Sequence, residues 1–246
     1  MVRNASGLFG NLLSTCPGSA VAGWRLATRF PTLPVAPHLD YNLPRYDLAA
    51  FLIEAELLLE WYLAKAGVKE TDAMRKEFVA LWSKALKPAL DAPPTWVLRD
   101  YHSPNLLWLA DRSDSARIGV LDFQDALIGP AAYDVASLLQ DARVDVPETL
   151  EMTLLGQYVR ARMSQHTEQG QQFDTADFML LYATLAAQRA TKILGIFARL
   201  DRRDGKPQYL RHMPRLWNYL QRSLAHPALA PLKDWYAANV PAPDGL

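Results

Sequence analysis

Residues 98–105 of this 246-residue chain read Leu-Arg-Asp-Tyr-His-Ser-Pro-Asn, and residues 121–125 read Leu-Asp-Phe-Gln-Asp. Asp100 and Asn105 lie on a polar stretch, and Asp122 follows an apolar run. Phosphoryl transfer from Mg·ATP needs this set, because one carboxylate must meet the acceptor hydroxyl while an amide oxygen and a second carboxylate hold the metal. Two protein ligands suffice for Mg²⁺, which prefers hard oxygen donors and keeps several waters.

The runs that flank this polar loop are short and strand-like. Residues 96–98, 105–109 and 118–121 are apolar, and residues 111–117 form a polar turn between the last two. An Asp and an Asn at this spacing are common by chance, so the surrounding order of strand, loop and strand gives the pattern its specificity. The alternative is that these residues only serve the geometry of two turns.

Apolar residues recur at helical spacing on both sides of this segment. Residues 46–62 are predicted to form a helix capped by Asp47, and residues 71–86 a second helix that Pro88 and the pair at 93–94 would end. Further helices are expected at residues 131–142, 147–165, 174–199, 207–223 and 228–238. The predicted fold class is therefore α+β, mainly α, with a small β-hairpin.

Residues 1–45 differ from the rest of the chain. They contain five prolines and four glycines and have no periodic apolar pattern, so we expect an irregular segment. The pattern changes at Tyr46, which predicts one helical domain over residues 46–240.

The composition excludes several classes of protein. The formal net charge is zero, whereas nucleic-acid-binding proteins usually carry a basic excess. No apolar run of about 18 residues exists, so no membrane-spanning helix is expected, and the N-terminal apolar run is too short for a secretory signal. The single cysteine, Cys16, forms no internal disulfide and no thiolate zinc site, which favours the reducing cytoplasm.

The helix expected at 174–199 is apolar nearly all round, which is typical of a buried helix. Arg189 and Lys192 interrupt it, and buried charge is costly unless it is paired. Arg189 would either form a structural ion pair with an acidic residue or contact phosphate or substrate at the wall of a cleft. Lys192 is a second candidate for contact with the substrate.

Four runs of the sequence match parts of one family pattern: residues 99–106, 119–126, 133–139 and 188–206. Through these runs the chain resembles the aminoglycoside phosphotransferase family over about residues 44–225. Within that family it is more similar to bacterial cell-wall sugar kinases, which phosphorylate N-acetylmuramate or N-acetylglucosamine at the anomeric hydroxyl. The resemblance implies a protein-kinase-like C-terminal lobe that uses ATP and Mg²⁺.

The resemblance also implies roles for single residues. Asp100 would be the catalytic base, and Asn105 and Asp122 would bind the nucleotide through Mg²⁺. His102 would either lie near the substrate or make a hydrogen bond within the loop. Asp125 would contact substrate, help the metal, or be a solvated acid.

Two further positions near the loop matter for its rigidity. Asp134 would brace the catalytic loop, or it would only place a favourable charge near the N-terminus of a helix. The family usually has a histidine two residues before the catalytic aspartate, where this chain has Leu98. We therefore expect a less rigid loop rather than lost chemistry.

A larger departure concerns the N-terminal lobe of kinase folds, which carries a phosphate-pairing lysine. No lysine precedes Lys65, which already lies in the helical part, and Gly7-x-x-Gly10 is not a phosphate loop. The N-lobe is therefore expected to be largely missing, through truncation, a frameshift, or genuine reduction of the protein. Such a chain would show weak or no turnover.

The sequence predicts an ATP-dependent phosphotransferase that acts on a hydroxyl of a small molecule, an amino sugar of the N-acetylmuramate or N-acetylglucosamine type. Its partners would include neither nucleic acid nor membrane. Two alternatives remain open at this point: a catalytically dead module that binds sugar or acts as a scaffold, and a part of a longer bifunctional protein.

Overall fold

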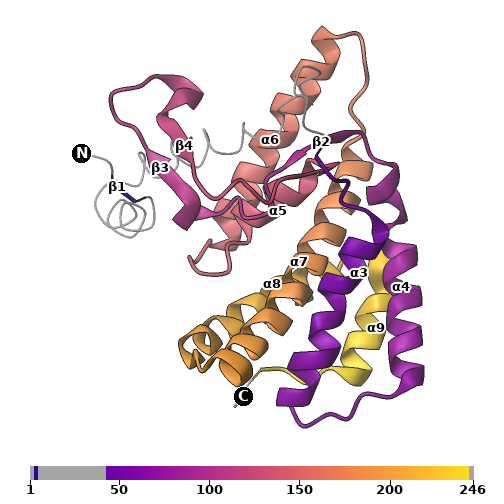
Figure 1. The fold of residues 1–246 in the computed structure, drawn as a ribbon. Coiled ribbons are helices and arrows are strands. Elements are labelled where there is room, and N and C mark those ends of the chain that lie inside the picture. The colour runs from indigo at the N-terminus through magenta and orange to yellow at the C-terminus, as the bar shows by residue number, and fades with distance from the viewer. Residues whose placement is uncertain (1–2, 5–42, 244–246) are drawn as a thin grey trace. The chain divides into compact units, whose positions relative to one another are not determined.

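The computed structural model describes residues 3–4 and 43–243 (Figure 1). Contacts divide the chain into two compact units. The first takes in residues 1–45 and 93–178, and the second residues 46–92 and 179–246. Most of the predicted irregular segment lies outside the described residues, so the division of the chain at residue 45 stays a prediction.

The strands belong to the first unit and form two small antiparallel sheets. β2 (Pro94–Val97) pairs with β5 (Leu127–Pro130), so that Trp96 lies opposite Ile128. The second sheet has the order β1-β3-β4, from β1 (Arg3–Asn4), β3 (Leu106–Trp108) and β4 (Ile118–Val120). The three predicted apolar runs are thus confirmed as strands. β5 was not predicted, because its Gly-Pro ending has the composition of a turn.

Helical turns and two helices complete the first unit. The 3₁₀ turn η2 (Ser103–Asn105) follows the polar loop, and η3 (Asp114–Arg117) occupies part of the predicted polar turn. α5 (Ala132–Leu139) is buried along its whole length and packs against α6 (Glu148–Glu168). The helix predicted at 131–142 ends earlier than expected, at Leu139.

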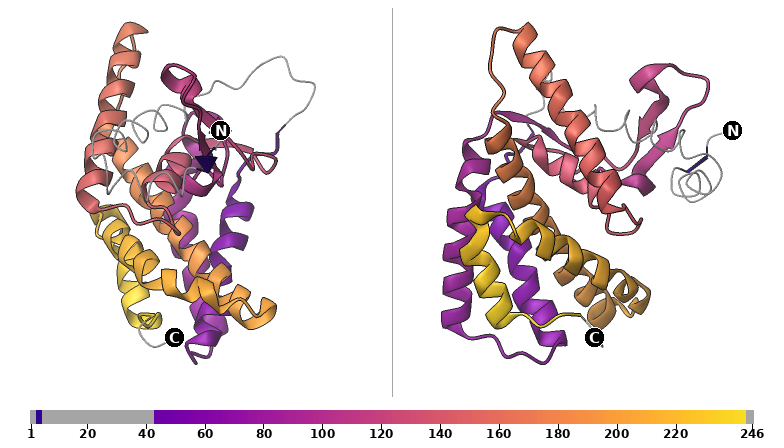
Figure 2. Two further views of the ribbon diagram at one scale, coloured as in Figure 1. Left: turned by 90° about the vertical axis from the view of Figure 1, so that its left-hand side faces the viewer. Right: turned by 180° about the vertical axis from the view of Figure 1, so that it is seen from behind.

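The second unit is helical, and Figure 2 shows its helices from two further sides. The pairs α3–α4, α4–α9 and α8–α9 are in contact. Its elements are α3 (Leu48–Leu57), the π-helical η1 (Leu58–Leu63), α4 (Asp72–Asp91), α7 (Thr175–Asp204, whose first four residues belong to the first unit), η4 (Pro207–His212), α8 (Met213–Leu224), η5 (Pro227–Leu229) and α9 (Ala230–Asn239).

The two N-terminal helices of this unit begin where the sequence predicts. The carboxylate of Asp47 accepts a hydrogen bond from the N–H of Ala50 at 2.9 Å, which confirms the predicted N-cap. The predicted end of the second helix at Pro88 is wrong, because α4 continues through Pro88 to Asp91. A proline in the last turn removes one helical hydrogen bond, whereas ending the helix there would expose the buried Ala89.

An aromatic cluster packs α4 against α9. The ring of Phe78 lies 4.8 Å from that of Trp235 and 6.2 Å from that of Trp82, centroid to centroid. Tyr236 joins the cluster at 6.5 Å from Trp82, and its hydroxyl lies 2.6 Å from that of Thr191 on α7. Rings at such separations add to the stabilisation that their buried area already provides.

α7 approaches α3 closely at Gly195. A Cβ atom at this position would overlap the backbone carbonyl of Leu57, so only glycine fits without movement of the helices. Leu57 is also where α3 changes to the wider π-helical turn of η1.

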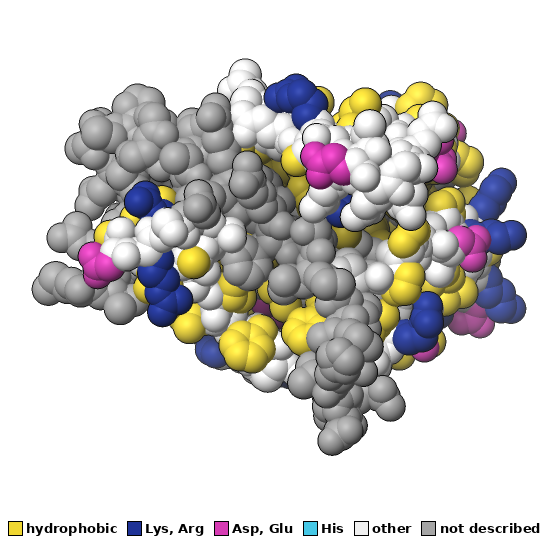
Figure 3. All heavy atoms as spheres, turned by 90° about the horizontal axis from the view of Figure 1, so that it is seen from above, with side chains coloured by type: hydrophobic (Ala, Val, Ile, Leu, Met, Phe, Trp, Pro, Cys, Tyr) yellow, Lys and Arg dark blue, Asp and Glu magenta, His cyan; other side chains and the backbone are white. Residues whose placement is uncertain are grey.

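Charged side chains of both signs are visible on one face of the molecule. On the face in Figure 3, Lys and Arg side chains alternate with Asp and Glu and with hydrophobic groups, consistent with the formal net charge of zero. None of the helices in the described ranges is both long and apolar enough to cross a membrane.

Candidate active site

The structure brings Asp100, Asn105 and Asp122 together. The side-chain Nδ2 of Asn105 donates to the backbone carbonyl of Asp100 at 2.9 Å and to Oδ2 of Asp122 at 3.3 Å. The N–H of Leu121 donates to the carbonyl of Asn105 at 2.9 Å, which ties the loop to the segment that carries Asp122. The predicted loop and turn therefore meet at one place in the first unit.

The backbone around these residues is strained. Among the described residues other than glycine, only Arg99 and Asp122 have positive φ, at 63° and 59°. A residue held in this region costs about 1–3 kcal/mol and persists only where its surroundings fix it. Both strained positions lie in the candidate site, one directly before Asp100 and one at the predicted metal ligand.

Contacts from α5 fix the strained start of the loop. The carboxylate of Asp134 accepts hydrogen bonds from the N–H of Leu98 at 2.7 Å and the N–H of Arg99 at 3.0 Å. The hydroxyl of Ser137 donates to the carbonyl of Arg99 at 3.1 Å. The loop is thus braced through its backbone, although Leu98 stands where the resemblance implies a histidine.

Asp100 and its neighbour Tyr101 face different environments. The side chain of Asp100 is exposed, whereas Tyr101 is 1% exposed. Burial raises the pKa of Tyr101 well above its usual value, and the negative charge of Asp134 adds to this shift. Tyr101 therefore keeps its proton at neutral pH and serves packing, while Asp100 is placed to meet a ligand.

The other predicted loop residues differ in their surroundings. His102 is 6% exposed, and its Nε2 lies 3.4 Å from the guanidinium of Arg143, which follows α5 in the chain. Its place near the substrate stays a prediction. Asp125 lies exposed in the turn before β5. Gln124, which the sequence did not single out, donates to Oδ1 of Asp122 at 2.6 Å.

Asp141 is a second residue that sequence reasoning missed. It lies two residues beyond α5 and contacts Ser103 in the middle of the loop, 38 residues earlier in the chain. No local motif predicts this contact, because the residues around Asp141 are those expected at the end of any helix.

Arg189 and Lys192 lie on α7 in the second unit. Lys192 Nζ pairs with Glu54 Oε1 at 2.8 Å, and both side chains are largely buried, at 13% and 12% exposure. The hydroxyl of Tyr46 also donates to Glu54. Lys192 thus forms a structural ion pair. Arg189 is 5% exposed on the same helix, and both interpretations of its charge stay predictions. Contact of either residue with substrate stays a prediction.

Asn105 and Asp122 offer the donor chemistry that Mg²⁺ requires. Both of the side-chain hydrogen bonds that Asn105 makes with Asp100 and Asp122 use its Nδ2, so neither of them uses its Oδ1. One amide oxygen beside one carboxylate is a hard, partial coordination shell of the kind that phosphate oxygens and waters complete. The described residues contain no cluster of three or more His, Cys, Asp or Glu side chains suited to a metal ion.

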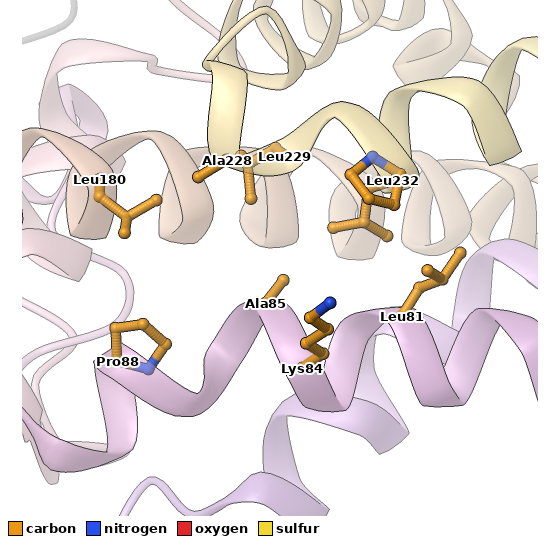
Figure 4. Close-up of a pocket in the computed structure, with 9 residues that line it drawn as sticks. Leu81, Lys84, Ala85, Pro88, Leu180, Ala228, Leu229 and Leu232 are labelled. Carbon is orange, nitrogen blue, oxygen red and sulfur yellow. The ribbon is translucent and has the colours of Figure 1, made fainter.

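A cavity of about 160 Å³ in the second unit has a different character. In Figure 4, Leu180, Leu229 and Leu232 face Ala85 and Pro88 on α4. Lys84 is the only charged residue of its lining, which contains no carboxylate or amide side chain. The oxygen ligands that phosphoryl transfer needs are therefore at the loop of the first unit and not in this cavity.

The exposed Asp100 on a loop braced by α5, beside the contact of Asn105 with Asp122, is the arrangement of a kinase-like phosphotransferase. The model of the phosphotransferase enzyme family APH matches residues 29–173, more than half of the chain. The chain belongs to this family.

Two curated relatives have the same description, N-acetylmuramate/N-acetylglucosamine kinase. The one from Caulobacter vibrioides is 38% identical over 201 residues, which is 82% of this chain and 53% of the relative. The one from Pseudomonas aeruginosa is 38% identical over 202 residues, 80% of this chain and 56% of the relative. The chain thus spans about half the length of these relatives.

Solved structures support the fold. A choline/ethanolamine kinase family protein from Mesorhizobium loti matches with a TM-score of 0.56 at 13% identity, over 95% of this chain and 69% of the other. Choline kinase from Cryptosporidium parvum matches with a TM-score of 0.50 at 14% identity, over 87% and 69%. The predicted kinase-like fold class, mainly helical with small antiparallel sheets, is confirmed.

Proposed function

We propose that this chain carries the catalytic half of an ATP-dependent kinase for the hydroxyl of an amino sugar of the N-acetylmuramate or N-acetylglucosamine type. The observation that carries the proposal is the contact of Asn105 with Asp122 beside Asp100. The description shared by the relatives at 38% identity supports the choice of sugar.

The residues divide the chemistry among them. The exposed carboxylate of Asp100 orients the acceptor hydroxyl and takes its proton while the hydroxyl oxygen bonds to the γ-phosphorus of ATP and the bond from that phosphorus to the oxygen of the leaving ADP breaks. Asn105 and Asp122 would hold Mg²⁺, which when bound neutralises charge on the phosphates. The bonds from α5 hold the strained backbone at Arg99, directly before Asp100, and so fix the start of the loop before the ligand arrives.

Consumption of ATP with N-acetylmuramate or N-acetylglucosamine tests the proposal. We expect weak turnover that requires a divalent cation and falls about 10²–10⁴-fold in Asp100→Asn, the usual contribution of a general base. Exposed Asp145→Asn in the same unit is the control, because it lies outside the loop.

Calorimetry provides the test that does not depend on turnover. We expect ATP to bind only with the divalent cation, and Asp122→Asn to weaken this binding while Asp100→Asn preserves it. Sugar binding without any metal-dependent binding of ATP would refute the kinase proposal and favour a sugar-binding module.

A further inference from the structure

Asp141 is a fully buried carboxylate with four hydrogen-bond donors around it. Its Oδ2 accepts from the N–H of Ser103 at 2.9 Å and from the hydroxyl of Ser103 at 2.8 Å. Its Oδ1 accepts from the N–H of Arg143 at 2.8 Å and the N–H of Val144 at 3.1 Å. A carboxylate is costly to bury unless donors replace its water, and here both oxygens are supplied.

The two oxygens serve different purposes. The bonds to Arg143 and Val144 are local and close a turn after α5, which is a common structural use of aspartate. The bonds to Ser103 span 38 residues and end inside the loop, between Asp100 and Asn105. The turn after α5 needs only the bonds to Arg143 and Val144, so the two bonds to Ser103 require a separate explanation.

Asp134 and Ser137 lie about one turn apart on α5, and Asp141 follows two residues beyond the end of that helix. Asp134 and Ser137 hold the loop just before Asp100. Asp141 holds it at Ser103, just after Asp100 and two residues before Asn105. The loop is therefore fixed on both sides of its exposed carboxylate.

We infer that Asp141 is a positioning residue that acts through Ser103 to keep Asn105 beside Asp122. The inference rests on the proposed function, since it assigns that pair to the metal. Without the two bonds from Asp141, the N–H and the hydroxyl of Ser103 lose these acceptors. The turn then keeps the backbone bonds from Asn105 N–H to the His102 carbonyl and from Leu106 N–H to the Ser103 carbonyl. The amide of Asn105 then leaves Asp122, and the metal site loses its geometry.

The test measures binding of Mn²⁺ with ATP to the full chain by electron paramagnetic resonance, where Mn²⁺ is a visible substitute for Mg²⁺. We expect Asp141→Asn, which keeps the volume but replaces one accepting oxygen by an amide, to weaken binding about 10–100-fold, the usual effect of a residue that orients a metal ligand. Ser103→Ala, which removes one of the two bonds to Oδ2, should give a smaller loss, and Ser103→Thr should retain binding.

Glu151→Gln is the matched control. Glu151 is a buried carboxylate of α6 that accepts from Gln140 at 2.9 Å and makes no contact with the loop among the bonds described. It should lower the free energy of unfolding without weakening Mn·ATP. Equal binding by folded Asp141→Asn and wild type would overturn the inference, as would equal losses in Asp141→Asn and Glu151→Gln.

Hydrogen exchange separates failure of the inference from failure of the proposed function. If the wild type does not bind Mn·ATP, the proposed function fails, and the role of Asp141 is judged from exchange of the amides in residues 98–105. We expect exchange there to be at least about tenfold faster in Asp141→Asn than in Glu151→Gln, since the loop opens locally. Unchanged protection of these amides would refute the positioning role.

Discussion

The loop of residues 98–105 in the first unit and the helices of the second unit are stabilised by different kinds of interaction. In the loop, the buried carboxylates of Asp134 and Asp141 accept hydrogen bonds from backbone N–H groups of a strained segment. In the second unit, apolar surfaces close on each other, as at the aromatic cluster of α4 and α9 and at the contact of Gly195 with α3.

The comparison shows where chemistry and stability reside in this chain. Apolar packing is non-directional and spread over many atoms, so it supports the fold but sets no atom to the accuracy that catalysis needs. A few charge-assisted hydrogen bonds are directional and hold a loop in one conformation. Substitutions should therefore affect stability most in the helical unit and loop order most in the first unit.

The largest expected effect is at Gly195. Gly195→Ala places a methyl group against the backbone of Leu57, which no side-chain rotation can relieve, so we expect a loss of about 3 kcal/mol in the free energy of unfolding. The measurement is urea unfolding followed by circular dichroism.

Gly156→Ala on α6 is the matched control, because its methyl group would meet only the flexible end of Arg160, at 3.5 Å. Alanine is the better helix former, so this change should stabilise the protein by about 0.5–1 kcal/mol. A neutral Gly195→Ala would mean that the contact between α3 and α7 is loose and that the comparison is mistaken.

An intermediate effect is expected at Asp134. Asp134→Asn removes one acceptor from the N–H groups of Leu98 and Arg99, and we expect a loss of about 2 kcal/mol with faster exchange of these amides. Exposed Asp177 in the first turn of α7 provides the control, since a charge at a helix N-terminus is worth only about 0.3–1 kcal/mol. If Asp134→Asn and Asp177→Asn lowered the free energy of unfolding by the same small amount, Asp134 would act only as a favourable charge near the N-terminus of its helix.

The same contrast explains how far the sequence could predict this molecule. Apolar periodicity located the helices and the three strands around the loop, and Asp47 was recognised as a cap because its partner is three residues away. Motif spacing predicted that Asn105 and Asp122 would meet. The periodicity and the cap involve residues close together in the chain, and the spacing of Asn105 and Asp122 belongs to a motif that binding of Mg·ATP requires.

What the sequence did not predict depends on distant or collective terms. The contact of Asp141 with Ser103 joins residues 38 positions apart, and nothing near either residue marks it. The pairing of Lys192 with Glu54 spans 138 positions, so no local pattern marks it. The passage of α4 through Pro88 reflects burial of the last turn, which outweighs a local propensity.

The smallest expected effect concerns Tyr158, which packs its ring 5.2 Å from that of Phe178 in the first unit. Burial raises the pKa of Tyr158 to about 12, and nearby Asp134 adds to the shift while Arg162 opposes it. Since a tyrosine in the unfolded chain titrates near pH 10, the unfolded state releases its proton first as the pH rises. The contribution of Tyr158 to stability is therefore complete below pH 10 and is lost between about pH 10 and 12.

Tyr158→Phe removes this titration, so between pH 10 and 11 the wild type should lose about 1 kcal/mol more unfolding free energy than the variant does. Tyr101 and Tyr236, whose pKa values burial also raises, contribute equally to both proteins and cancel in the difference. Urea unfolding at pH 8, 9, 10 and 11 measures this difference. The plots of unfolding free energy against pH for the two proteins should be parallel up to pH 9. Curves that stay parallel to pH 11 would show that the Tyr158 hydroxyl is hydrated in the folded protein, and that apolar closure in the first unit is weaker than its packing indicates.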